Sequence, residues 1–458
     1  MENENYGLVV IGAGPGGYTA ALEAAKGGIK TAIVERDLTG GICLNRGCIP
    51  TKVMLYGSEL YRHFREAGDY GAEAGEVRMD RDRLAAKREE VQNSLRQGIE
   101  SLFKKEKVEL VRGEAEILDR GTVKVGERIL KTERILIATG SEPSTIPVPG
   151  ADLPGVVTSD GILAMTLTGI QKVLIVGGGV IGTEFACALH NLGIQVVIVE
   201  ALDRMLAGMD KEISQSIRQL FKKRGIEVHL SAAVKEFRRE DNGGLTCLFE
   251  EKGQVEAVSA DLVLLAAGRR PCTRGIHTER LGIRTEKGRI LVDENGETNV
   301  PGIYALGDVT GGVQLAHRAS AQAKRLAAHF CGKTSSLVLE SVPSCVYTDP
   351  EIASVGLTEA QAKEKGIQAV SAKYPMLANG KTVVENGERG FIRIVAEKDT
   401  GRFLGAQMMC GRATDMIALC AVAVSCGLTL RQLASAVYPH PTCSEGIGEA
   451  VELCMEKV

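Results

Sequence analysis

Two cysteines lie close together in a glycine-rich segment, residues 40–52. Cys43 and Cys48 have four residues between them. Such a pair binds zinc only with a second pair of Cys or His, and the sequence has no second close cluster, so we expect no metal site. Two interpretations stay open at this point: two unrelated buried thiols, or a dithiol whose thiolates exchange with a disulfide.

A disulfide between these two cysteines would need an irregular backbone. In a regular helix, Cα atoms five residues apart lie roughly 8–9 Å from each other. A disulfide requires a separation of less than about 7 Å. Gly47 and Pro50 permit the distortion that a bonded pair would need.

A histidine near the end of the sequence is the second group that could do chemistry. His440 is followed five residues later by Glu445. An imidazole titrates near neutral pH and can accept a proton from a thiol, and a neighbouring carboxylate can orient it and stabilise its charge. A single histidine is more often structural, so the acid is what supports a role as a general base.

Two longer units repeat one pattern: an aliphatic run, a Gly-x-Gly-x-x-Gly turn, a stretch of helical composition and a second aliphatic run that ends in an acid. In both units the acid follows the first glycine by 23 residues. The glycines allow a tight turn, close approach of a pyrophosphate and helix–strand packing, and the acid can accept a hydrogen bond from a ribose hydroxyl. Two bound dinucleotides are therefore expected, and their presence favours the redox interpretation of the cysteines. The two sets are Gly12, Gly14, Gly17 and Glu35, and Gly177, Gly179, Gly182 and Glu200.

The second acid bears on the choice of nucleotide. A carboxylate at Glu200 would repel a 2′-phosphate, which favours NAD over NADP. Arg204 lies nearby and leaves NADP as the alternative. Both units also share a later aliphatic strand that ends in a glycine, Gly140 and Gly268, with a proline three residues further on. This agreement indicates that a domain type was duplicated.

The organisation of the chain follows from these units. We expect an α/β fold with two Rossmann-like dinucleotide-binding domains and a C-terminal α+β dimerisation domain. A proline-rich connector over 141–155 separates the units, a long exposed helix is expected over 78–107, and helices are expected at 411–427 and 429–437. The predicted boundaries are 1–145 with 271–340 for the first dinucleotide-binding domain, 146–270 for the second, and 341–458 for the dimerisation domain.

The composition excludes several other classes of protein. The formal net charge is −3 and the pI is about 6.3, without the basic excess of a nucleic-acid binder. Glycine contributes 54 of 458 residues without an excess of proline, which indicates close backbone approaches and not a disordered polymer. The N-terminus is acidic, and the longest apolar stretch, 416–424, is far shorter than the ~20 residues of a membrane span. We therefore expect a cytoplasmic protein that binds neither nucleic acid nor membrane.

Taken together, these motifs resemble the pyridine nucleotide–disulfide oxidoreductase family. Residues 40–52 match its redox motif, Gly-Gly-x-Cys-x4-Cys-Ile-Pro-Thr/Ser-Lys, and residues 298–308 match its second flavin motif. The similarity runs from the first glycine turn to the C-terminal segment and is greatest to the branch that oxidises protein-bound dihydrolipoamide. It implies an NAD-dependent flavoprotein oxidoreductase that reduces NAD⁺ to NADH through FAD and a redox disulfide.

The resemblance also implies roles for individual residues. Cys43 would be the interchange thiol and Cys48 the thiol nearer the flavin. His440, paired with Glu445, would act as the base at the disulfide of the partner subunit, which implies a homodimer. FAD would be bound by Gly12, Gly14, Gly17, Glu35, Lys52, Ala115, Gly140, Asp308 and Ala316, and NAD by Gly177, Gly179, Gly182, Glu184, Glu200, Val234 and Gly268. Lys52 would lie by the flavin N5 and pair with Glu184.

Some positions depart from the family pattern. Ile42 replaces a threonine before the first cysteine, and Gln322-Ala323 stands where Glu-Gly is common. Tyr438 and Cys443 differ from the commoner residues beside the histidine. None of these changes removes a catalytic group, so they bear on the redox potential and turnover and not on the type of reaction. The other ten cysteines, Cys443 included, are expected to be ordinary thiols.

The implied partner is a lipoylated protein, either an acyltransferase or a glycine-cleavage carrier protein. Few residues precede Tyr6, so the lipoyl group is expected to come from another chain. The alternatives are a glutathione- or mercuric-reductase-like enzyme, or an NADH and flavin redox sensor without turnover. The acid at Glu200 argues against a glutathione-reductase-like enzyme. The single Cys454 near the end argues against a mercuric-reductase-like enzyme, which would have adjacent C-terminal cysteines.

Overall fold

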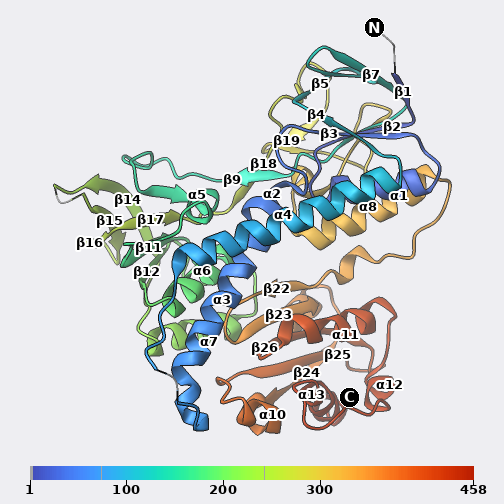
Figure 1. Ribbon diagram of the computed structural model, residues 1–458. Coiled ribbons are helices and arrows are strands. Elements are labelled where there is room, and N and C mark those ends of the chain that lie inside the picture. The colour runs from blue at the N-terminus through green and yellow to red at the C-terminus, as the bar shows by residue number, and fades with distance from the viewer. Residues whose placement is uncertain (1–3, 74, 242) are drawn as a thin grey trace.

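The computed structural model describes residues 4–73, 75–241 and 243–458, so residues 1–3 of the acidic N-terminus lie outside the described part. Three main sheets organise the chain, one in each of the three parts seen in Figure 1. Two are five-stranded and parallel, and the third is five-stranded and antiparallel. The predicted α/β fold class is confirmed by this arrangement.

The first parallel sheet has the strand order β21-β8-β2-β3-β4. Its helices α1 (Pro15–Lys26) and α8 (Ala316–Phe330) pack side by side against one face (Figure 1). A four-stranded sheet, β1-β7-β6-β5, packs against the other face. The strands are β2 (Leu8–Ile11), β3 (Thr31–Glu35), β4 (Glu109–Arg112), β8 (Ile135–Ile137), β21 (Ile303–Ala305), β1 (Glu4–Tyr6), β5 (Ala115–Asp119), β6 (Thr122–Val125) and β7 (Arg128–Thr132).

The second parallel sheet repeats this plan with the order β10-β17-β11-β12-β13. Helices α6 (Val180–Asn191) and α7 (Lys211–Lys223) cover one face, and the antiparallel sheet β14-β15-β16 covers the other. Strands buried on both faces must be apolar throughout, which explains the continuous aliphatic runs in the sequence. The strands are β10 (Val156–Thr158), β11 (Lys172–Val176), β12 (Gln195–Glu200), β13 (Glu227–Leu230), β17 (Leu262–Leu265), β14 (Ala232–Arg239), β15 (Leu245–Glu251) and β16 (Gln254–Ala260).

The third sheet has the order β22-β23-β26-β25-β24, and helices α11 (Ala413–Ser425) and α13 (Glu445–Met455) share one apolar core with it. The helix expected at 429–437 is the shorter α12 (Leu430–Ala434). The strands are β22 (Ser344–Val346), β23 (Glu351–Gly356), β24 (Ala369–Pro375), β25 (Phe391–Glu397) and β26 (Phe403–Cys410). Further short elements are α5 (Ser159–Leu163), α9 (Glu359–Glu364), α10 (Gly380–Val384), β19 (Thr285–Glu286) and β20 (Arg289–Ile290).

Two further features join the three parts. The strands β9 (Ser141–Pro143) and β18 (Arg269–Pro271) form an antiparallel ribbon between the two parallel sheets (Figure 1). Helix α3 (Cys48–Glu66) packs against α6 and against the long helix α4 (Arg81–Lys105), and its Met54 lies in one core with Phe185 and Val346. Helix α3 therefore touches both other parts. Within the described residues, no helix is long and apolar enough to cross a membrane.

Candidate active site

The two cysteines of the redox motif form a disulfide at a break between two helices. Helix α2 (Gly41–Arg46) carries Cys43, and α3 begins with Cys48. Gly47 stands between the helices with φ −146° and ψ −108°, which is not helical, and the two Cα atoms lie only 4.7 Å apart. The irregular backbone that a disulfide requires is therefore present, and it lies at one of the two residues expected to permit it.

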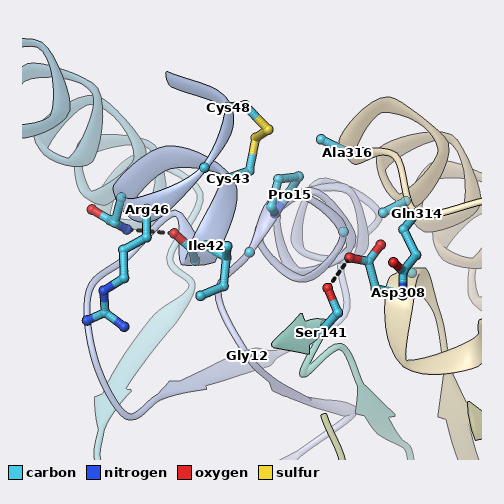
Figure 2. Close-up of a pocket in the computed structure, with 18 of the residues that line it drawn as sticks. Gly12, Pro15, Ile42, Cys43, Arg46, Cys48, Ser141, Asp308, Gln314 and Ala316 are labelled. Carbon is cyan, nitrogen blue, oxygen red and sulfur yellow. Dashed lines mark hydrogen bonds between the residues drawn. A yellow bond between two sulfur atoms is a disulfide. The ribbon is translucent and has the colours of Figure 1, made fainter. Parts of the chain in front are cut away.

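The disulfide lies directly beside the first glycine turn. Gly41 has φ +60°, and a Cβ placed on it would meet the Gly14 Cα at 2.6 Å, so only glycine allows this approach. Figure 2 shows Cys43 and Cys48 next to Pro15, with Asp308 and Ala316 across the cavity. The redox pair and the nucleotide turn therefore belong to one site.

A cavity of about 600 Å³ collects many of the residues predicted from the sequence. Its walls come from the first part, from α5 and α6 of the second and from β22 and Tyr347 after it in the third. Predicted residues that line it are Gly12, Gly14, Glu35, Cys43, Cys48, Lys52, Ala115, Gly140, Glu184, Asp308 and Ala316. Gly17, Gly177, Gly179, Gly182, Glu200, Val234, Gly268, His440 and Glu445 do not line it.

The two glycine turns have the same geometry. A Cβ on Gly12 would lie 2.5 Å from the carbonyl oxygen of Ala138, and one on Gly177 would lie 2.5 Å from that of Ala266. The third glycine of each turn is equally constrained, because a Cβ on Gly17 or Gly182 would lie 1.8 Å or 1.9 Å from the carbonyl oxygen of its first glycine.

The middle glycines differ from the others in a way that points to a ligand. A Cβ on Gly14 would come no closer than 3.9 Å to another group, and one on Gly179 would meet nothing within 4 Å. Both residues are extended and stand at the N-terminal end of a helix, α1 and α6 respectively. Each turn thus has bare backbone facing open space at a helix N-terminus, which fits the pyrophosphate of a dinucleotide.

The acids that end the second strands bind their own glycine turns. Glu35 accepts hydrogen bonds from the backbone N–H of Ala13 at 2.7 Å and of Asp37 at 2.9 Å. Glu200 accepts from Gly178 at 2.5 Å and from Leu202 at 2.7 Å. Both carboxylates therefore stand beside the turns, where the repeated pattern places the ribose. Among the described residues, Arg204 donates to the carbonyl of Ala207 at 3.0 Å, and its Nε is buried without a partner.

A hydrogen-bonded bridge connects the ribbon to Asp308. The hydroxyl of Ser141 donates to the Asp308 carboxylate at 2.6 Å (Figure 2), and Arg269 Nε donates to the same hydroxyl at 2.8 Å. Burial lowers the pKa of Arg269, while Asp160 and Asp308 act in the opposite direction. Sequence analysis missed Ser141 and Arg269. They directly follow the matching glycines Gly140 and Gly268, so the internal repeat was the signal that could have found them.

Lys52 and Glu184 meet across two helices at the wall of the cavity. Lys52 Nζ lies 3.0 Å and 2.9 Å from the two carboxylate oxygens of Glu184. Glu184 is 4% exposed, so this carboxylate is buried and does not face solvent. The structure brings this predicted pair together from α3 and α6.

His440 and Glu445 form a dyad in the third part. His440 Nδ1 lies 2.6 Å from Glu445 Oε1, and Glu445 Oε2 accepts from the Thr442 N–H at 2.7 Å. The pKa of Glu445 lies below its usual value, first because of the hydrogen bond from the Thr442 N–H and second because of the hydrogen bond with His440. The His440 side chain is 77% exposed and lies outside the cavity, so a single chain does not bring the dyad to the disulfide.

Two further predictions concern residues away from the redox centre. Val234 lies on β14, partly buried against the core between β14–β16 and the second parallel sheet. The unpaired cysteines include several buried thiols whose pKa is raised by burial, to about 12 for Cys187, Cys247 and Cys420. A thiol that stays protonated is a poor nucleophile, which agrees with the expectation that these are ordinary thiols.

Comparison with known proteins gives the same result over the whole chain. The pattern described as pyridine nucleotide-disulphide oxidoreductase matches residues 6–323, and that of the corresponding dimerisation domain matches residues 342–451. A dihydrolipoyl dehydrogenase of Bacillus subtilis is 38% identical over 98% of this chain and 96% of its own length. One from Geobacillus stearothermophilus is 38% identical with the same coverage.

Among solved structures, the HOCl-induced flavoprotein disulfide reductase RclA from Escherichia coli has a similar fold. It superposes with a TM-score of 0.87 at 29% identity, covering 98% of this chain and 100% of that one. These matches confirm the resemblance inferred from the motifs. The chain belongs to the pyridine nucleotide-disulphide oxidoreductase family.

Proposed function

We propose that this chain oxidises dihydrolipoamide to lipoamide and reduces NAD⁺ to NADH, as a dihydrolipoyl dehydrogenase does. The observation that carries the proposal is the Cys43–Cys48 disulfide, which lines the same cavity as the first glycine turn and the Lys52–Glu184 pair. The full-length similarity to dihydrolipoyl dehydrogenases supports it.

The residues present fit FAD at the first glycine turn and NAD at the second. Bare backbone at Gly14 and Gly179 leaves room for each pyrophosphate, and Glu35 and Glu200 stand where each ribose would lie. When bound, FAD supplies a two-electron acceptor between the dithiol and the nicotinamide. We assign FAD to residues 1–145 with 271–340, NAD to 146–270, and the dimer interface to 341–458.

The exchange of sulfur–sulfur bonds takes place between the two cysteines and the two thiols of the substrate. One thiolate of dihydrolipoamide attacks the sulfur of Cys43, which breaks the Cys43–Cys48 bond and leaves Cys48 as a thiolate. The second substrate thiolate attacks the sulfur that is joined to Cys43, which closes lipoamide and releases Cys43. Two electrons and two protons leave the substrate, and the electrons reach the cysteine pair.

The base in this proposal is His440. It takes a proton from the substrate dithiol, and Glu445 keeps the imidazole oriented and stabilises the cation that forms. Because His440 is exposed and outside its own chain's cavity, we propose that it acts at the disulfide of the partner subunit in a homodimer. The match of residues 342–451 to a dimerisation domain supports this arrangement.

We further propose that the substrate is held by another chain in the cytoplasm. The lipoyl group would belong to an acyltransferase or to a glycine-cleavage carrier protein, and the similarity to dihydrolipoyl dehydrogenases supports such a partner. A pull-down from the native cell that identifies the lipoylated protein tests this partner.

Steady-state kinetics of the FAD-loaded protein test the reaction itself. We expect turnover with dihydrolipoamide and NAD⁺, and much slower turnover with NADP⁺. Glutathione disulfide and Hg²⁺ with NAD(P)H, as the alternative substrates, should give little activity. Full occupancy by FAD without dihydrolipoamide turnover would refute the proposal and favour a redox sensor.

A further inference from the structure

Glu184 receives hydrogen bonds from two other parts of the chain. Lys52 of α3 donates to both of its oxygens, and the backbone N–H of Tyr347 donates to Oε1 at 3.0 Å. Tyr347 directly follows β22, so α3, α6 and the third part meet at one buried carboxylate. This meeting point lines the cavity that also holds the disulfide.

The ring of Tyr347 also contacts the lysine. Lys52 Nζ lies 4.3 Å from the centroid of the ring, within the range of a cation–π interaction. The ammonium is therefore held by the Glu184 carboxylate and by the face of the Tyr347 ring. A lysine side chain has a long flexible stem, so one ion pair alone leaves it several positions. The ring removes part of that freedom.

The surroundings of Tyr347 indicate that its ring does more than fill a core. The residue is 36% exposed and lines the cavity, while its neighbour Val346 is fully buried. Partial burial raises the pKa of Tyr347 to about 12, which is further above physiological pH than the ordinary value, and the hydroxyl is neutral there. The aromatic face and the backbone N–H are then the groups that act on the charged pair.

We propose that Tyr347 is a positioning residue that fixes the Lys52 ammonium through its ring and the Glu184 carboxylate through its backbone N–H. The proposal deepens the function above and rests on it, with Lys52 beside the flavin as the resemblance to the family implies. Because the N–H is retained in any substitution except proline, a change of the side chain separates the ring from the hydrogen bond.

The test compares Tyr347→Phe, which keeps the ring, with Tyr347→Met, which removes it. Acetic anhydride labels the protein, and mass spectrometry gives the rate at Lys52 in FAD-loaded and FAD-free protein. We expect labelling in the Met variant to be about five- to tenfold faster and the Phe variant to stay near wild type. Lys30, whose Nζ lies 4.9 Å from the Tyr6 ring, is the internal reference and should not change.

A second measurement uses the reduction potential of the bound flavin. The reduction potential should be lower in the Met variant than in wild type, because a loosely held cation stabilises the reduced flavin less. The Phe variant should keep the wild-type potential. Wild-type labelling of Lys52 in the Met variant would overturn the proposal, as would a Phe variant that behaves like Met. If the Met variant does not fold, Tyr347→Leu takes its place with the same expectations. An absence of dihydrolipoamide turnover in wild type would refute the proposed function and leave the labelling result intact.

Discussion

The glycines of the first turn allow ligand binding to be separated from folding. In Gly14→Ala, the new Cβ would come no closer than 3.9 Å to protein atoms, and the residue is extended, so the FAD-free chain should fold normally. In Gly17→Ala, the Cβ would lie 1.8 Å from the carbonyl oxygen of Gly12, far inside the 3.4 Å of ordinary contact. The backbone would have to move to accommodate it.

The expected magnitudes follow from these distances. The Gly14 methyl group occupies the space expected for the pyrophosphate and displaces charged hydrogen bonds worth about 1.5–3 kcal/mol each, so FAD affinity should fall by about 10- to 100-fold. Gly17→Ala should lose FAD as well and destabilise the FAD-free protein by about 1–3 kcal/mol through overpacking.

Flavin fluorescence titration of FAD-free protein measures the affinity, and thermal unfolding of the same samples measures the stability. Gly182→Ala is the matched control, because its Cβ would lie 1.9 Å from the carbonyl oxygen of Gly177 in the second turn. It should weaken NAD binding and leave FAD bound. Wild-type FAD affinity in Gly14→Ala, or an unfolding shift as large as that of Gly17→Ala, would refute the reasoning.

Three further predictions concern the thiol chemistry. Cys43→Ser should abolish lipoamide reduction while FAD stays bound, as judged by turnover and flavin absorbance; retained activity would contradict its role as interchange thiol. His440→Gln should slow dihydrolipoamide oxidation by about 10²- to 10⁴-fold with the circular dichroism spectrum unchanged; a near-normal rate at neutral pH would exclude it as the base. The lowered pKa of Glu445 keeps its carboxylate charged at neutral pH, so the contact with His440 should be lost only as the pH falls through that lowered value. NMR of the His440 imidazole against pH should show this transition in wild type and not in Glu445→Gln. The same transition in the variant would count against the dyad.

Much of the site could be predicted because its signals are local. The glycine turns, the acids 23 residues after the first glycines and the cysteine pair each lie within one strand–turn–helix unit or one short segment. Hydrogen bonding and steric limits at short range decide such patterns. The internal repeat added three strands of each parallel sheet, and the structure places these side by side as β8-β2-β3 and β17-β11-β12.

Contacts between distant residues were not predicted in the same way. Ser141 and Arg269 are 128 residues apart, and Tyr347 and Glu184 are 163 apart. The internal repeat marks the positions of Ser141 and Arg269, but no spacing rule predicts either contact, because each contact depends on how separately folded parts pack together. The Lys52–Glu184 pair, 132 residues apart, was expected only from the resemblance to a family.

The sequence by itself determined the type of chemistry: two dinucleotide turns and a dithiol, whose residue types and spacing serve no other common purpose together. The tertiary structure decided which of these groups share one cavity. It placed Cys43 and Cys48 against the first turn and closed the cavity with Glu184 and Tyr347. It also left His440 outside this cavity, on the exposed segment before α13, where it does not reach the disulfide of its own chain.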